Sequence, residues 1–232
     1  MKLAVMQPYL FPYIGYWQLM NAADVFVILD DVNYIKRGWI NRNRIQAPGG
    51  ELMVTLPVEH ASQNSLICDM RFSEDERGRG KFVNSIKTAY RAAPGFKALE
   101  GIVDGCFSYD SRSLTDFIRH QIVLVSARLG IGTSVIKASE LRGLPHKKGQ
   151  DGILELCGIF GADTYINPIG GTELYRKDAF AEKGIRLYFL KTDFAALEAK
   201  SGGRRCDLSI LDLIAFSDRN VLNEMLSDYE LI

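Results

Sequence analysis

The sequence has few cysteines, no long apolar run and no excess of charge of either sign, and each absence excludes a class of protein. Its four cysteines form no CxxC pair and have no histidines at metal-ligand spacing, so we expect reduced, buried thiols rather than a disulfide framework or a zinc module. No apolar run approaches the roughly 20 residues that span a bilayer. Lys plus Arg and Asp plus Glu both number 28, which gives no general attraction to nucleic acid.

The chain also lacks the segments that direct secretion or divide a protein into modules. A strand pattern begins at residue 2 without a basic segment and apolar stretch before it, so we expect no signal peptide and a cytoplasmic location. No internal repeat or low-complexity linker is visible. Its 232 residues are 47% hydrophobic and 24% charged. This mixture predicts a single α/β domain over 1–232, in which 200–232 form a C-terminal linker and helix.

What is present is an alternation of short apolar runs and helix-forming segments. The runs KLAVMQ and DVFVILDD flank a helix-forming segment at 13–23, which predicts two parallel strands joined by a right-handed crossover. The turn signal PGG at 48–50 predicts a hairpin of 40–46 with 51–58. The fold class is therefore α/β, with a layered, mostly parallel sheet, an inserted β-hairpin and helical elaborations. Further strands are expected at 133–139, 163–168 and 185–191, and helices at 79–93, 113–130 and 149–160.

The densest polar stretch, DDVNYIKRGWINRNR at 30–44, follows the second predicted strand. Aromatic and basic residues alternate there, a pattern that suits a site which stacks a ring and clamps phosphate or carboxylate. Open α/β sheets bind ligands at this carboxyl edge, whereas an exposed hairpin of mixed charge is the alternative. Asp30 and Asp31 could form a metal pair, a general base or acceptors for sugar hydroxyls. Lys36 is a further catalytic candidate. The substrate-binding candidates are Asn33, Tyr34, Arg37, Trp39, Asn41, Arg42 and Asn43.

A second cluster lies around the predicted helix at 149–160. Three basic residues and a glutamine adjoin the start of this helix, where free backbone amides and nearby cations favour an anion. The sequence NPIGG follows the next strand and lets backbone amides approach a ligand closely, although a sharp structural turn would also explain it. Neither part contains a Walker loop or the GxGxxG spacing of a dinucleotide fold. The candidates from this cluster are His146, Lys147, Lys148, Gln150, Asn167, Gly170, Gly171 and Tyr175.

Two weaker signals lie elsewhere in the chain. Lys87 and Tyr90 share one face of the helix at 79–93, where they either bind substrate or lie on the solvated side. The uncharged stretch MQPYLFPYIGYW follows the first strand, and its side chains either form the wall of a pocket or cover the sheet. The substrate-binding candidates in it are Gln7, Tyr9 and Tyr16. His60 and His120 are interpreted as structural or surface residues.

Taken together, these stretches resemble the WbqC-like family of bacteria. The resemblance rests on QPYLFPYIGYW, DDVNYIKRGWINRNRI, LMVTLPV, SIKTAY and GADTYINPIGGTELY. It implies an enzyme encoded among O-antigen and other surface-glycan genes that acts on a nucleotide-linked or activated sugar. A looser similarity links the first strand and YIGY to the Rossmann-like sheet of nucleotidylyltransferases, whose HxGH motif handles ATP phosphates. Here Tyr13 and Tyr16 replace both histidines, and tyrosine carries no imidazolium charge.

The resemblance and the polar clusters predict a transferase that moves an acyl or aminoacyl group onto a nucleotide-linked amino sugar. Its catalytic candidates are Asp30, Asp31, Lys36 and His146. Two alternatives remain: a nucleotidylyltransferase-like enzyme acting on a sugar or small acid, and a non-catalytic protein that binds an activated sugar. We expect no metal and no tightly bound cofactor, the co-substrate being an acyl or nucleotide donor. The expected partner is a small molecule, with no nucleic acid and no membrane span, and the sequence is compatible with a homo-oligomer.

Overall fold

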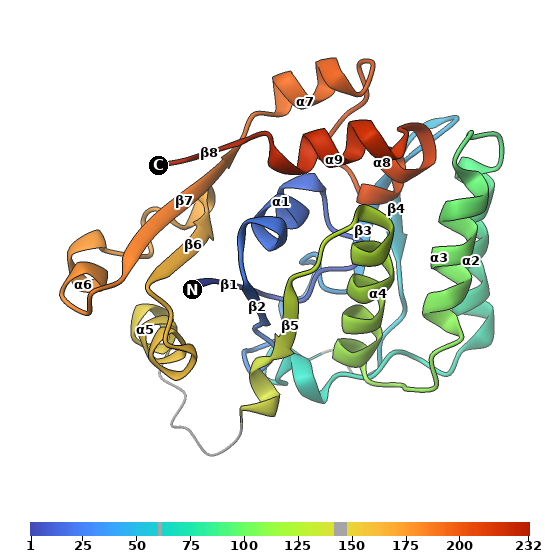
Figure 1. Cartoon of the computed structure of the whole chain (residues 1–232). Coiled ribbons are helices and arrows are strands. Elements are labelled where there is room, and N and C mark those ends of the chain that lie inside the picture. The colour runs from blue at the N-terminus through green and yellow to red at the C-terminus, as the bar shows by residue number, and fades with distance from the viewer. Residues whose placement is uncertain (60–61, 142–147) are drawn as a thin grey trace.

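A computed structural model describes residues 1–59, 62–141 and 148–232, and a parallel sheet runs through its centre (Figure 1). The sheet of the described chain has the strand order β5-β2-β1-β6-β7-β8. Neighbouring strands pair in parallel except β8, which runs antiparallel to β7. The predicted mostly parallel α/β sheet is therefore confirmed. The strands are β1 (Lys2–Met6), β2 (Val25–Ile28), β5 (Ser134–Lys137), β6 (Thr164–Pro168), β7 (Arg186–Thr192) and β8 (Tyr229–Leu231).

The strand order determines where a ligand site is expected. When the six strands are counted along the chain, their order across the sheet is 3-2-1-4-5-6, the order of a doubly wound sheet. The winding reverses between β1 and β6, and ligands of such sheets bind in the crevice outside the carboxyl ends of these strands. Gln7 follows β1 directly, and Asn167 is the second-to-last residue of β6, shortly before the glycine pair. Both residues therefore lie at the reversal.

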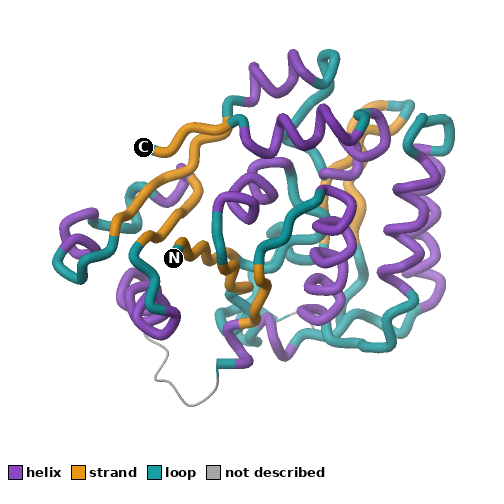
Figure 2. Tube along the Cα trace, viewed as in Figure 1, coloured by secondary structure: helices purple, strands orange, loops and turns teal. Residues whose placement is uncertain are grey.

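Helices cover both faces of the sheet because its strands are apolar on both sides. Ala4 and Phe26 face one core, while Leu3 and Val5 face the other, as the two-residue repeat of a strand requires. The first core contains residues of α1 (Ile14–Ala22), α4 (Leu114–Leu129) and α9 (Arg219–Ser227). The second contains residues of α5 (Gly149–Phe160) and α6 (Lys177–Ala181), which lie on the opposite side of the sheet (Figure 2).

A long insertion separates β2 from β5. It contains the predicted hairpin, formed by β3 (Arg42–Ala47) and β4 (Gly50–Thr55), whose pairing is antiparallel. Helices α2 (Glu76–Tyr90) and α3 (Phe96–Phe107) follow before α4. Helix α3 was absent from the expectations, although its buried Leu99, Ile102, Val103 and Cys106 have helical spacing. In the described residues, short 3-10 helices lie at Ile67–Asp69 in this insertion, at Ala138–Glu140 after β5 and at Ile169–Gly171 after β6.

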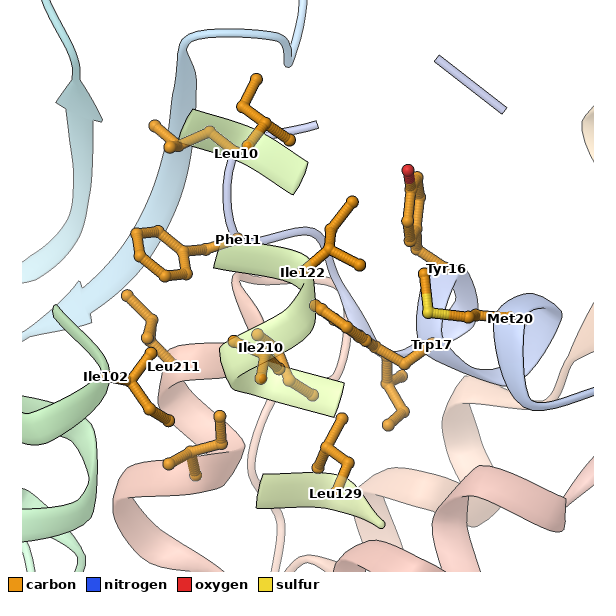
Figure 3. Close-up of a cluster of buried hydrophobic side chains, with 14 of the residues drawn as sticks. Leu10, Phe11, Tyr16, Trp17, Met20, Ile102, Ile122, Leu129, Ile210 and Leu211 are labelled. Atoms are coloured by element: carbon orange, nitrogen blue, oxygen red, sulfur yellow. The ribbon is translucent and has the colours of Figure 1, made fainter. Parts of the chain in front are cut away.

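The stretch after β1 lies in the first core. Figure 3 shows Leu10, Phe11 and Trp17 among side chains of α4 and α8 (Ile210–Phe216). Trp17 is fully buried, and its Nε1–H donates to the Pro12 carbonyl at 2.9 Å. Most side chains of this stretch therefore cover the sheet. Whether Gln7, Tyr9 and Tyr13 form the wall of a pocket is considered with the site below.

The expectation of a linker and one helix at 200–232 requires correction. After α7 (Phe194–Lys200), this segment contains α8, α9 and β8. Helix α8 is buried at every residue from Ile210 to Ala215, so it lacks the polar stripe that reveals a helix in sequence. Strand β8 has three residues, too few for a recognisable alternation, and it forms through pairing with the edge strand β7.

Candidate functional site

Asp30 fixes the carboxyl end of β2 to the turn after β5. Its side chain is fully buried, and both carboxylate oxygens accept hydrogen bonds from Ser139, at 2.9 Å from the backbone N–H and 2.7 Å from the hydroxyl. Burial raises the pKa of Asp30, and the bonds from Ser139 oppose this rise. Because its oxygens are occupied and sealed from solvent, Asp30 is placed to hold the edge together.

Replacing Asp30 by alanine is expected to lower the free energy of unfolding by about 2 kcal/mol, because two donors of the half-buried Ser139 lose their acceptor. Urea denaturation measures this loss. Ser139→Ala removes one of the two bonds and serves as the matched comparison, with about half the effect. A stable Asp30→Ala protein that had lost ligand binding or turnover would instead show that Asp30 acts on the substrate.

Asp31 lies beside a cleft of about 400 Å³ at the same edge, which we call the α5 cleft. Asp31 and Asn33 come from the polar stretch after β2, Lys148 and Gly149 from the start of α5, and Tyr175 from the segment after β6. The structure therefore brings residues of the two predicted clusters into one cavity. A second carboxylate, Glu155, and Gly152 also line it. The rest of the lining is apolar: Leu29, Val32, Leu66, Ala138, Leu141, Ile153, Leu156 and Ile159.

The start of α5 offers backbone donors to the α5 cleft. Lys148 is the N-cap residue, and within the described part of the chain no side chain caps this helix. Its first amides and the Lys148 ammonium therefore favour an anion in the cleft. Gln150 points elsewhere, since its Oε1 accepts from the Arg176 N–H at 2.7 Å. The candidates His146 and Lys147, like His60, lie outside the described residues.

In the turn after β6, the backbone of Gly171 lies very close to the side chain of Asn167. A Cβ atom on Gly171 would lie 1.9 Å from Asn167 Nδ2, so glycine is required while Asn167 keeps its position. Asn167 is 6% exposed, and its Oδ1 accepts from the Tyr165 hydroxyl at 3.0 Å. The Tyr165 and Tyr175 rings meet edge to face at 5.8 Å. This chain of contacts places Tyr175 on the cleft wall, whereas Gly170 is exposed.

Tyr34 and Asn41 brace the base of the stretch at 30–44. The Tyr34 hydroxyl donates to Asn41 Oδ1 at 2.8 Å, and Asn41 Nδ2 donates to the Leu56 carbonyl at 2.8 Å. Both residues are buried. Lys36 and Arg37 are exposed and line neither this cleft nor the cavity described next. The stretch thus combines an internal brace with an exposed basic turn.

A second cavity of about 200 Å³ lies between the β1–α1 connection and the hairpin, and we call it the aromatic cavity. Its lining residues are Tyr9, Pro12, Tyr13, Trp39, Asn43, Arg44, Phe194 and Asp207. The guanidinium groups of Arg42 and Arg44 lie over the Trp39 ring, 6.0 and 5.4 Å from its centre. Tyr16 is excluded from this cavity, because its ring is buried and its hydroxyl donates to the Gln7 carbonyl at 3.1 Å. No described residue hydrogen-bonds the Gln7 side chain.

The family model of the WbqC-like proteins matches residues 7–224, which include every described residue of both cavities. The chain belongs to the WbqC-like protein family. A relative from Mycobacterium tuberculosis, the uncharacterized protein Rv1507c, is 24% identical over 216 residues that cover 92% of each chain. No solved structure matches the chain.

In this WbqC-like protein, Lys87 and Tyr90 lie away from both cavities. The Lys87 ammonium pairs with Glu100 and Asp104 of α3 at 3.2 and 2.8 Å, which ties α2 to α3. Its hydrogen bond to Asp104 raises the pKa of Lys87. Tyr90 is fully buried, and burial raises its pKa. Lys87 and Tyr90 therefore stabilise the packing of the insertion.

The sequence expectations missed several cavity residues of this WbqC-like chain. Tyr13, Arg44, Phe194 and Asp207 line the aromatic cavity, and three of them lie outside the polar stretch at 30–44. No local pattern marks Phe194 or Asp207, because the other cavity residues, between positions 9 and 44, are at least 150 residues away in sequence. Within the described ranges, no group of three His, Cys, Asp or Glu side chains is arranged to hold a metal ion. None of the described helices is long and apolar enough to cross a membrane.

Proposed function

We propose that this protein is a cytoplasmic transferase of surface-polysaccharide synthesis that moves an acyl or aminoacyl group onto a nucleotide-linked amino sugar in the α5 cleft. The pathway and the sugar derive from the family resemblance. The site derives from one observation: Asp31, Lys148 and the start of α5, which no described side chain caps, line a single cavity at the carboxyl edge of a doubly wound sheet. A carboxylate and an anion site in one largely apolar cavity are the groups that such a transfer needs.

In this proposal the α5 cleft acts by positioning and proton transfer. The first amides of α5 and the Lys148 ammonium hold the phosphates of the substrate. The sugar amine attacks the carbonyl carbon of an activated acyl donor, the bond from that carbon to its leaving group breaks, and the leaving group departs with the electron pair. Asp31 accepts the proton that the nitrogen releases. Asp31 is preferred to Asp30 as this base, because Asp31 lines the cleft while both Asp30 oxygens are engaged by Ser139.

The proposal is tested with Asp31→Asn, after a thermal-shift screen of nucleotide sugars, acyl-CoA esters and nucleoside triphosphates has identified the ligands that stabilise the fold. We expect Asp31→Asn to keep the wild-type melting temperature and to lower kcat about 100-fold, the usual contribution of a general base. Lys148→Ala is expected mainly to raise KM, since it removes an anion contact. Asp110→Asn, an exposed carboxylate between α3 and α4, is the control. Full turnover by folded Asp31→Asn protein would refute the assignment.

Nucleotidylyl transfer is the second candidate, favoured by the strand order and by Gly15. A Cβ atom on Gly15 would lie 2.4 Å from the Tyr13 ring and 2.8 Å from Thr192 Oγ1, so the start of α1 approaches the end of β7 closely. Tyr16 weakens this candidate, because its hydroxyl is bonded to the Gln7 carbonyl inside the core. Pyrophosphate release from ATP or CTP distinguishes the two reactions, and tight binding of an unchanged nucleotide sugar would favour a binding protein.

A further inference from the structure

The aromatic rings that line the aromatic cavity are partly exposed to solvent. Trp39 and Phe194 are 37% and 38% exposed, and Tyr9 and Tyr13 are half-buried. The rings of Tyr13 and Phe194 are 6.0 Å apart and inclined at 33°, so together they form a nearly continuous apolar surface. Exposed ring surface costs free energy in water, and its concentration in one cavity indicates a ligand that covers it.

The wall that carries Tyr9 and Tyr13 is held rigidly. Phe11, between them, has a φ of +42°, which is strained for a residue with a side chain. Its backbone N–H donates to Gln121 Oε1 at 2.7 Å, and its carbonyl accepts from Asn43 Nδ2 and from the Ser209 hydroxyl at 2.7 and 2.9 Å. Side chains from three separate parts of the chain therefore maintain one strained residue, which preorganises the wall.

The polar end of the cavity carries no net charge. Arg44 pairs with Asp207 and Glu51 at 3.2 and 3.4 Å, and Arg205 pairs with the same two carboxylates at 2.6 and 2.9 Å. The hydrogen bond from Arg205 lowers the pKa of Asp207, so its carboxylate is an acceptor at neutral pH. Two guanidinium groups balance two carboxylates, which favours a neutral ligand that both donates and accepts hydrogen bonds over a phosphate.

We propose that the aromatic cavity is a nucleobase subsite, in which the base stacks on Tyr13 and Phe194 and its polar edge meets Asp207 and Arg44. Its volume of about 200 Å³ is below the 300 to 1,000 Å³ of a site for a whole drug-sized ligand, so it suits one ring system. Stacking on aromatic side chains is the general means by which proteins hold a base. The assignment rests on the proposed function, because a nucleotide-linked sugar would supply the base.

The test uses ligands without phosphate, so that the α5 cleft does not contribute. Uridine, cytidine, adenosine and guanosine are titrated while tryptophan emission and saturation-transfer NMR are recorded. Trp39 is the reporter, because the second tryptophan, Trp17, is fully buried. We expect saturable binding of at least one nucleoside, and a loss of affinity of about tenfold or more in Phe194→Ala. Phe194→Tyr should retain binding, and Tyr109→Ala, which removes a 42% exposed ring from another site, should leave it unchanged.

Three results would overturn the subsite: no binding of any nucleoside, equal affinity in wild type and Phe194→Ala, or displacement of the nucleoside by methyl glucoside alone. The nucleobase subsite and the proposed reaction can be refuted independently of each other. If Asp31→Asn retains turnover but nucleoside binding still depends on Phe194, the subsite stands and the proposed reaction is wrong. If Asp31→Asn loses turnover and Phe194→Ala changes neither nucleoside affinity nor the KM of the substrate, the reaction stands and the subsite is wrong.

Discussion

Replacing Asn43 by alanine is expected to lower the free energy of unfolding by about 3 kcal/mol. The Asn43 side chain is 7% exposed, and its Nδ2 donates to the carbonyl oxygens of Leu10 and Phe11 at 2.8 and 2.7 Å. Its Oδ1 accepts from the Arg44 N–H at 2.8 Å. Alanine removes all three bonds and leaves the Leu10 carbonyl with no described donor in a buried region, a situation that costs about 1 to 3 kcal/mol.

Urea denaturation followed by circular dichroism measures this change. Asn84→Ala is the matched control, because Asn84 is exposed on α2 and its loss should alter stability by less than about 0.5 kcal/mol. The strain at Phe11 remains in the variant while one of its supports is gone, so the cavity wall should loosen together with the loss of stability. An Asn43→Ala protein as stable as the wild type would mean that other contacts determine the path of this loop.

The pH dependence of stability is expected to depend strongly on Asp212. This residue is 3% exposed, its Oδ1 accepts from the Gln46 N–H at 3.1 Å, and burial raises its pKa to about 6. The folded protein therefore binds the proton more tightly than the unfolded chain, in which this carboxyl titrates near 3.8. The stability that Asp212 contributes is complete below pH 4 and is lost as pH rises through 6. The difference between the two pKa values corresponds to about 3 kcal/mol.

Asp212→Asn isolates this contribution, because asparagine keeps the acceptor for Gln46 and does not titrate. We expect the free energy of unfolding of the variant, minus that of the wild type, to increase by about 2.5 kcal/mol between pH 4 and pH 7. Glu224→Gln, an exposed carboxylate on α9, should show no comparable trend. A constant difference between wild type and Asp212→Asn across this range would show that Asp212 does not titrate there.

The elements that could be predicted are those whose pattern is local. Helix α4 begins after Ser113, whose hydroxyl caps it, and ends at Gly130 in the left-handed conformation, both of which are sequence signals. The hairpin follows from its turn residues, and α5 has the bounds that its apolar spacing indicated. Helix α8 and strand β8 could not be predicted in this way, because one is buried on all sides and the other is defined by its partner strand.

The sequence selected residues of both predicted clusters, but it did not indicate which of them line a cavity. Residue types at 30–44 and 148–175 were sufficient to select Asp31, Asn33, Lys148 and Tyr175, which the fold gathers in the α5 cleft. They were not sufficient to separate Asp31 from Asp30. That distinction depends on Ser139, a residue 109 positions away in sequence that occupies both Asp30 oxygens.

The sequence by itself determined the alternation of strands and helices, the family and the segments that carry polar chemistry, because these depend on neighbouring residues. Only the tertiary structure decided that the sheet reverses between β1 and β6, that Tyr34, Asn41 and Asn43 are braces, and that Tyr13 and Phe194 share a cavity. The physical reason is that the role of a side chain depends on its hydrogen-bond partners and on its exposure to solvent. Both are determined by the packing of segments that lie far apart along the chain.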